Sequence, residues 1–238
     1  MPDGMDRAEW RSVQEALESL LPYYERVNLV NTFARLPVWR AWVARSARPD
    51  DVVVEVGTGP GGFARQLGAR RVYCLDPSSA MLSHARGRLE SARYGFLSGL
   101  AEQMPIRTGS VDKVYCSFSF RDFFDKPAAV REFARVLRPG GELHVLEAAR
   151  PPPGLRRAFM DSWLRIGTRA VVSVLVPREV RRRWREPPFD AFVRTYAAMA
   201  APEAYADLLR HSGFEAVRVE YVSMRSVFRL QGARARTT

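Results

Sequence analysis

The sequence predicts an α/β protein built on a mostly parallel sheet with helices on both faces. Short apolar runs alternate with segments of helical periodicity across residues 49–150, and this alternation is typical of a parallel sheet. One apolar run, 52–56, leads into the glycine-rich stretch 57–62, and the next run ends at Asp76. A glycine turn and a carboxylate that follow neighbouring strands are how such sheets hold nucleotide-like cofactors, although the pair also arises by chance.

The chain begins with helical segments that precede the first strand. They cover about residues 6–21, 23–33 and 36–47, and the first repeats apolar side chains about one helical turn apart. We expect them to form an N-terminal helical cap over residues 1–48 of a single domain.

Strands and helices then alternate through a cofactor-binding core at residues 49–150. We expect helices at 61–68, from Ser78-Ser79 onward and at 126–137, and strands at 52–56, 71–75, 94–98, 112–118 and 141–147. Ligands of such sheets bind beyond the carboxyl ends of the strands, where the strand order reverses.

A proline-rich stretch at 151–154 ends this regular part of the chain. We expect a helical insertion on the substrate side over residues 151–200, with helix at 155–176. In the last segment, 201–231, a helix runs from Pro202 to Gly213, and 214–222 and 226–230 alternate like two paired strands. The tail from residue 232 is expected to fray.

The composition indicates an intracellular protein with a strong basic balance. The net charge is +11, and only Lys113 and Lys126 of the 37 basic residues are lysines. Either a GC-rich genome or attraction to nucleic acid or anionic lipid explains this charge. No apolar run is long enough to span a membrane, and the N-terminus lacks the pattern of a secretory signal. Cys74 and Cys116 fall inside predicted strands and are interpreted as buried apolar residues in a reducing, cytoplasmic compartment.

Three further segments narrow the class of protein. They are 99–105, which precedes the fourth strand, 117–126, which leaves it, and 135–147, a helix end followed by a Pro-Gly-Gly turn and a strand. Together with the glycine loop and Asp76, they resemble the class I S-adenosylmethionine-dependent methyltransferases. The resemblance implies a Rossmann-like fold with a seven-stranded sheet that ends in an antiparallel hairpin, and S-adenosylmethionine as the cofactor.

The resemblance extends to the C-methyltransferases of ubiquinone and menaquinone biosynthesis. Segment 117–126 is similar to that family's Ser-Phe-Gly-Leu-Arg-Asn-Val-x-Asp-Lys, and 135–147 is similar to its second motif, with Ala149 where the motif closes on Ser. Tyr24 and Asn28, followed by Trp39, match an N-terminal pattern of the family. The implied reaction is methyl transfer to a ring carbon of a prenylated quinol, such as a demethylmenaquinol.

The same resemblance implies roles for individual residues. The glycines pass the backbone beneath the methionine portion of the cofactor and Asp76 holds the ribose hydroxyls, with helix capping as an alternative that suits Ser78 better. Tyr24, Asn28 and Phe118 are expected to contact the acceptor. The expected cofactor-binding residues are Glu55, Gly57, Gly59, Gly61, Ala64, Asp76, Pro77, Leu100, Ala101 and Ser117. No Cys/His spacing indicates a metal site.

Arg121 is the main catalytic candidate. Loss of a hydroxyl proton makes a quinol ring carbon nucleophilic, and a guanidinium can stabilise the phenolate. Arg121 stays protonated, so the proton goes to an ordered water or to Asp122. The alternative for Arg121 is a salt bridge to Asp122 or Asp125. His144 lies mid-strand and is interpreted as a packing residue more readily than as a base.

The sequence also departs from the family pattern. Leu36 replaces His, Asp122 replaces Asn, and Leu100 stands at the adenine contact, where these enzymes usually carry Asp or Asn. Residues 155–195 do not match the family closely, so a methyltransferase for another small molecule, such as a lipid amine or a natural-product phenol, remains an alternative. The charge keeps an RNA methyltransferase open, although no Asn-Pro-Pro-Tyr-type motif is present.

The partners are least defined by the sequence. The basic cluster 181–185 either contacts an anionic membrane as a peripheral site or forms a solvated helix face. A homodimer and a monomer are both compatible with the sequence.

Overall fold

The computed structural model describes residues 7–184 and 187–236, which form a seven-stranded sheet in the order β3-β2-β1-β4-β5-β7-β6. The first five strands run parallel, and β7 pairs antiparallel with both β5 and β6. The predicted sheet with its terminal antiparallel pair is therefore confirmed. The strands are β1 (Val52–Val56), β2 (Arg71–Asp76), β3 (Tyr94–Ser98), β4 (Val111–Ser117), β5 (Leu137–Ala148), β6 (Phe214–Val222) and β7 (Val227–Arg234).

The strand order fixes where a ligand can bind. From β1 the chain moves outward to β2 and β3, and then returns to the other side of β1 with β4 and β5. The connections after β1 and β4 therefore leave the sheet in opposite directions, and a crevice forms between them at the carboxyl ends of the strands.

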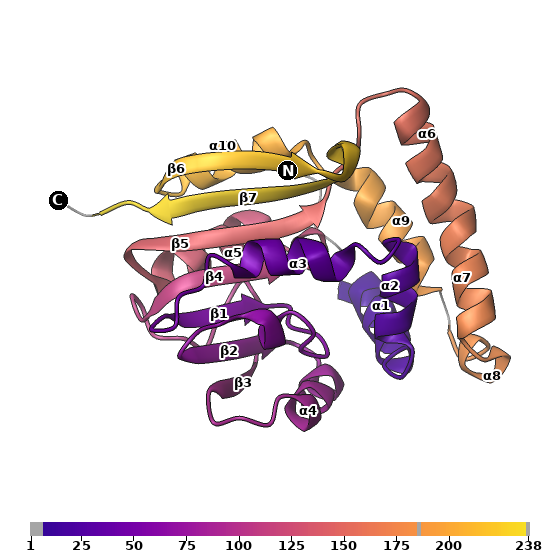
Figure 1. Ribbon diagram of the computed structural model, residues 1–238, viewed down its shortest axis with the longest axis horizontal. Coiled ribbons are helices and arrows are strands. Elements are labelled where there is room, and N and C mark those ends of the chain that lie inside the picture. Colours follow the sequence, from indigo (N-terminus) through magenta and orange to yellow (C-terminus); the bar gives the residue numbers. More distant parts are fainter. Residues whose placement is uncertain (1–6, 185–186, 237–238) are drawn as a thin grey trace.

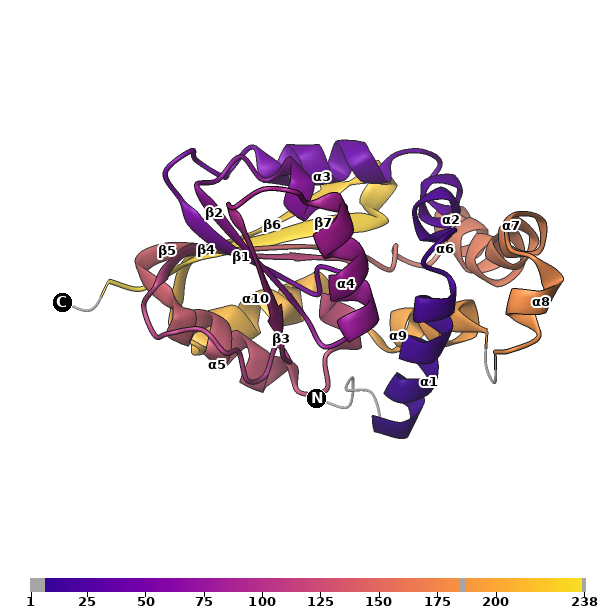
Figure 2. The ribbon, with the colours of Figure 1, turned by 90° about the horizontal axis from the view of Figure 1, so that it is seen from below.

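Helices cover both faces of the sheet (Figures 1 and 2). One face carries α3 (Leu36–Ala44), the other carries α5 (Lys126–Val136) and α10 (Pro202–His211), and α4 (Ser79–Arg88) packs beside β2 and β3. Neighbouring side chains of β1 serve different faces, since Val53 packs in the apolar cluster with α3 and Val54 in the cluster with α5 and α10.

A second group of helices lies beyond the carboxyl ends of the strands, at the right of Figures 1 and 2. In it α2 packs against α7 and α1 against α9, so the N-terminal cap and the 151–200 insertion join in one helical layer. The members are α1 (Arg7–Ser19), α2 (Tyr24–Asn31), α6 (Leu155–Ser162), a π-helical turn (Trp163–Gly167), α7 (Thr168–Leu175), α8 (Arg178–Arg181) and α9 (Pro188–Ala198).

Several local expectations are wrong. The helix expected at 61–68 is only a 3-10 turn, Ala64–Gln66, because Gly61 has a φ of +80° and the segment holds further glycines with low helix propensity. The expected fraying does not occur at 232–234, because these residues belong to β7 and pair with neighbouring strands. The helical insertion expected over 151–200 is present, but the bounds of α8 and α9 within it are not predicted from the sequence.

Some expectations concern residues outside the described part of the chain. The absence of a secretory signal was inferred from residues 1–6, and Arg185 of the basic cluster and the end of the tail, 237–238, also lie outside the described residues. No described helix combines the length and the apolar character that crossing a membrane requires.

Candidate functional site

A cavity of about 1030 Å³ lies between the carboxyl ends of the strands and the helical layer. Its walls come from the loop after β1, the ends of β2 and β4, and helices α1, α2, α6 and α9. The site therefore sits at the crevice that the strand order creates.

The glycine-rich loop forms the floor of the cavity near β1. Gly57 and Gly59 line the cavity and have positive φ angles of 71° and 53°. A Cβ atom on Gly57 would lie 2.4 Å from the Cβ of Ser119, so the backbone of the loop passes where no side chain fits.

Asp76 holds this loop at the end of β2. Its Oδ2 accepts a hydrogen bond from the Gly59 N–H at 2.8 Å, and its Oδ1 accepts one from the Ser78 N–H at 2.9 Å. Burial raises the pKa of Asp76, while these two bonds oppose the shift. Each oxygen keeps a lone pair for a further donor. Ser78 caps α4 by accepting from the Met81 N–H, which confirms the capping assignment.

Three predicted cofactor residues do not line the cavity. Glu55 is 1 % exposed and accepts a hydrogen bond from Thr58 Oγ1 at 2.5 Å, so it supports the loop from behind. Burial raises the pKa of Glu55 to about 7, and the bond from Thr58 opposes the shift. Gly61 packs against Leu89, and Ala64 is fully buried. The residues that do line the cavity are Gly57, Gly59, Asp76, Pro77, Leu100, Ala101 and Ser117.

Arg40 lines the same end of the cavity, although no motif in the sequence predicts a role for it. Its Nε donates to Ser117 Oγ at 3.1 Å and connects α3 to the end of β4. The only signal in the sequence is its position beside Trp39, whose ring lies 6.1 Å from that of Phe118.

Arg121 lies at the other end of the cavity, in a 3-10 turn (Phe120–Asp122) that follows β4. Phe118, with a φ of +59°, turns the chain between β4 and this segment. Arg121 Nη1 donates to Glu147 Oε1 and to the Phe118 carbonyl oxygen, both at 2.9 Å. The guanidinium also lies 4.5 Å from the centre of the Phe192 ring.

The alternative of a salt bridge from Arg121 to Asp122 or Asp125 is confirmed for Asp122. Asp122 contributes an oxygen at 3.4 Å, but the shorter contact is to Glu147, which is 0 % exposed. Asp125 instead caps α5 by accepting from the Ala128 N–H. Neither Glu147 nor Phe192 is predicted from the sequence to belong to the site. Glu147 could have been found as a carboxylate that ends a strand, whereas no pattern marks Phe192.

The charged groups at this end of the cavity shift one another's pKa values. Burial acts to lower the pKa of Arg121, but Asp122 and Glu147 outweigh it and raise the pKa. Burial raises the pKa of Asp122 to about 6, with Arg121 opposing the shift. Burial also raises the pKa of Tyr24, against Arg40 and Arg121.

The remaining walls at this end are mostly apolar and aromatic. All three predicted acceptor contacts, Tyr24, Asn28 and Phe118, line the cavity. Phe33 packs on Trp163 with ring centres 4.5 Å apart, which joins α2 to the insertion. Apolar lining residues from the helical layer are Leu29, Phe33, Leu155, Phe159, Met160, Trp163, Leu164 and Phe192.

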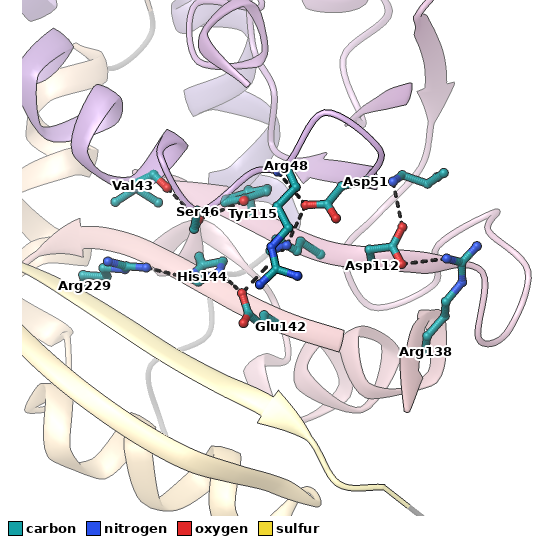
Figure 3. Close-up of polar contacts among 12 residues, drawn as sticks. Val43, Ser46, Arg48, Asp51, Asp112, Tyr115, Arg138, Glu142, His144 and Arg229 are labelled. Carbon is teal, nitrogen blue, oxygen red and sulfur yellow. Dashed lines mark hydrogen bonds and ion pairs between the residues drawn. The ribbon is translucent and has the colours of Figure 1, made fainter. Parts of the chain in front are cut away.

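His144 belongs to a separate polar group on the α3 side of the sheet, shown in Figure 3. Its ring contacts Glu142 and Arg229, each at 3.1 Å, and lies 5.1 Å from the Tyr115 ring. His144 is buried and does not line the main cavity, which confirms that it is a packing residue.

Neither cysteine lines the cavity. Cys74 and Cys116 are free and buried in β2 and β4, as predicted, and burial raises the pKa of Cys74 to about 12. Within residues 7–184 and 187–236, no cluster of three or more His, Cys, Asp or Glu side chains could hold a metal ion.

Comparisons with known proteins agree with this geometry. The family described as "Methyltransferase domain" matches residues 54–145. Demethylmenaquinone methyltransferase of Deinococcus radiodurans is 30% identical over 226 residues, which cover 90% of this chain and 89% of that protein. Ubiquinone/menaquinone biosynthesis C-methyltransferase UbiE of Rubrivivax gelatinosus is 27% identical, covering 90% of this chain and 83% of that protein.

Solved structures share the fold. An S-adenosylmethionine-dependent methyltransferase of Thermotoga maritima has a TM-score of 0.62 at 22% identity, covering 93% of this chain and 99% of that chain. A further one from Aquifex aeolicus has a TM-score of 0.59 at 16% identity, covering 88% of this chain and 97% of that chain.

Proposed function

This chain belongs to the S-adenosylmethionine-dependent methyltransferases, in the family of the Deinococcus radiodurans demethylmenaquinone methyltransferase, and we propose that it methylates a ring carbon of a prenylated quinol. One observation carries the proposal. A single cavity joins an end with the features of a nucleoside site to an end where the Arg121 cation lies 4.5 Å from the centre of the Phe192 ring, among other aromatic and aliphatic lining residues.

The residues at the first end fit the cofactor. Asp76 lines the cavity, and each of its carboxylate oxygens can accept a further hydrogen bond from the ribose hydroxyls. The backbone at Gly59, where a side chain would meet no neighbour, leaves room for the methionine portion. Leu100 and Ala101 form the wall for the adenine, and Ser117 lies at the end of β4. Glu55, Gly61 and Ala64 act from behind this surface by fixing the loop. When bound, S-adenosylmethionine supplies an electrophilic methyl group on a positively charged sulfur.

Arg121 acts on the acceptor. Its guanidinium stabilises the negative charge that develops when the quinol loses a hydroxyl proton. With the cofactor bound, the electron pair of the ring carbon would form the new carbon–carbon bond as the carbon–sulfur pair stayed on sulfur. Water would then take the proton from the methylated ring carbon, and Asp122 would return its proton to the phenolate oxygen, so that the quinol is restored and one proton is released overall. Glu147 and the Phe118 carbonyl hold the guanidinium in place, so Arg121 is positioned before the acceptor enters.

Asp122 receives the hydroxyl proton. Its pKa of about 6 places it in the ionised form at neutral pH, and it lies beside the cation that holds the resulting phenolate. Tyr24, Asn28 and Phe118 hold the quinol ring between the two ends of the cavity.

The rim of the cavity suits a lipid surface, from which a prenylated acceptor would enter. Phe33, Leu155 and Phe159 line the cavity and are 53%, 91% and 56% exposed. Arg26, Arg35 and Arg156 line the same opening, which gives the rim an apolar and cationic character. In the basic cluster, Arg182 and Arg183 are exposed, whereas Trp184 packs inward beside Leu20 and Val27. We expect the arginines, and not this tryptophan, to meet the membrane.

Methyl transfer to a short-chain demethylmenaquinol tests the function. The purified protein is incubated with labelled S-adenosylmethionine under reducing conditions, and label is expected in a ring-methylated quinone. Arg121→Gln is expected to lower kcat by about 10²- to 10³-fold, as loss of a positioned charge does elsewhere. Arg107→Gln, which removes an exposed arginine outside the cavity, is the matched control. Cofactor binding without transfer would overturn the quinol as the acceptor and favour another small molecule.

A further inference from the structure

We propose that Arg40 is a cofactor-binding residue that grips the carboxylate of the methionine portion of S-adenosylmethionine. The proposal rests on the cofactor, which the family establishes, and not on the quinol. Failure of the quinol assay would therefore leave it untouched.

The position of the guanidinium is the first argument. Its Nε donates to Ser117 Oγ at the end of β4, and its Nη1 would lie 3.1 Å from a Cβ placed on Gly62, in the loop after β1. The side chain thus spans the gap between β1 and β4, where the strand order reverses. This is the part of the cavity assigned to the methionine portion.

The positive charge of Arg40 also favours binding of a carboxylate. Among the described residues, no carboxylate forms an ion pair with Arg40. The nearby Glu25 is paired with Arg88 at 2.7 Å, and Glu55 accepts its hydrogen bond from Thr58. A guanidinium that is half-buried in a cavity and lacks a counter-ion is stabilised by an incoming carboxylate.

The third argument is hydrogen-bond geometry. With Nε occupied by Ser117, the two terminal nitrogens of Arg40 remain for a ligand. A carboxylate matches a guanidinium with two parallel hydrogen bonds, and such a pair discriminates strongly against a ligand that lacks the acid. Arg40 also opposes the burial-driven rise in the pKa of Tyr24, so its charge acts within the cavity.

Decarboxylated S-adenosylmethionine provides the test, because it differs from the cofactor by this carboxylate alone. Dissociation constants are measured by calorimetry for both compounds. The wild-type protein is expected to bind S-adenosylmethionine about 10- to 100-fold more tightly than the decarboxylated compound. In Arg40→Gln this preference is expected to fall below about 3-fold, with the affinity for the decarboxylated compound unchanged.

Two further variants keep the result interpretable. Gly62→Ala displaces the guanidinium without removing its charge and is expected to reduce the preference as well. Arg45→Gln, at the exposed end of α3, is the matched control and is expected to keep it. If Arg40→Gln loses affinity for the two compounds equally, the role of Arg40 is purely structural and the proposal is overturned. A wild-type protein with no preference would overturn it even if Arg40→Gln does not fold.

Discussion

The Arg121 guanidinium and the Glu147 carboxylate meet at 2.9 Å, although their positions are 26 residues apart in the chain. Glu147 lies near the end of β5 and is completely buried, whereas Arg121 reaches the cavity from the turn after β4. The cation that we propose to act on the acceptor is therefore anchored in the interior by an anion that does not line the cavity.

This ion pair predicts a thermodynamic cycle. Glu147→Leu leaves the Arg121 cation without its main partner and is expected to lower the free energy of unfolding by about 3 kcal/mol. Arg121→Met leaves the Glu147 carboxylate buried without its cation and is expected to lower the free energy of unfolding by a similar amount. The double variant is expected to be more stable than either single variant, because two apolar side chains replace the pair. Urea unfolding of the four proteins measures the cycle, and additive losses would contradict it.

Asp122 predicts the pH dependence of catalysis. A base must be ionised to accept the quinol proton, and the pKa of Asp122 is about 6, because burial outweighs Arg121. The rate should therefore rise with pH through about 6 and level off above 7. Asp122→Asn is expected to lower kcat and to abolish this inflection. An unchanged inflection in this variant would assign the proton to another group.

Glu55 predicts the pH dependence of stability. Its pKa of about 7 in the folded protein exceeds the ordinary glutamate value of 4.5, so the folded protein binds the proton more tightly than the unfolded chain. The stabilising contribution is complete below pH 4.5 and is lost as pH rises to about 7. Glu55→Gln should therefore raise the free energy of unfolding at pH 8 by about 1 to 3 kcal/mol and do little at pH 4. The exposed variant Glu90→Gln should change neither value.

Replacing Leu100 by an acidic residue is expected to increase the affinity for the cofactor. It lines the cavity where related enzymes usually carry a carboxylate or amide at the adenine. Leu100→Asp restores an acceptor for the adenine amino group and is expected to tighten S-adenosylhomocysteine binding about 5-fold. Leu100→Ala provides no acceptor and should not tighten it. Equal affinities for the wild-type protein and Leu100→Asp would show that backbone groups already satisfy the adenine.

The rim of the cavity predicts binding to vesicles. The protein is expected to sediment with anionic vesicles at low salt and less with neutral ones. Replacing Leu155 and Phe159 together by Ser should weaken binding at least about 10-fold, because each removes an apolar side chain from the lipid contact. Val38→Ser, at an exposed apolar position outside the cavity, is the control. Protein that stays in the supernatant with anionic vesicles would contradict the lipid contact.

The sheet is predictable from the sequence because its strands are marked locally. The strand 52–56 is an apolar run that ends at a glycine turn, and the expected limits of β1 match the structure. The glycine loop and Asp76 are equally local signals, and both line the cavity together. Three of the predicted cofactor residues miss the cavity because resemblance identifies the segment, whereas packing decides which side chains face the ligand.

Local sequence motifs do not mark the remaining residues of the site. Arg40 from α3 lines the cofactor end of the cavity and Phe192 from α9 lines the acceptor end. Glu147 from β5 does not line the cavity but holds Arg121 in place, and only the folded chain brings these residues together. Helix α9 begins at the second of two consecutive prolines, Pro188, which suits the first position of a helix, and the helix packs against α1. The site thus depends on contacts between residues that lie far apart in the sequence, and local sequence patterns do not predict such contacts.

The order of the strands has a consequence for synthesis. Strand β5 is complete at residue 148, but its neighbour β7 begins only at residue 227. While the intervening segment is being made, the outer edge of β5 presents unpaired N–H and carbonyl groups. A nascent chain that ends before Val227 therefore offers a long, apolar strand edge to other chains. Premature termination in this region is therefore expected to yield a species prone to aggregate, because β7 covers that edge only when translation is nearly finished.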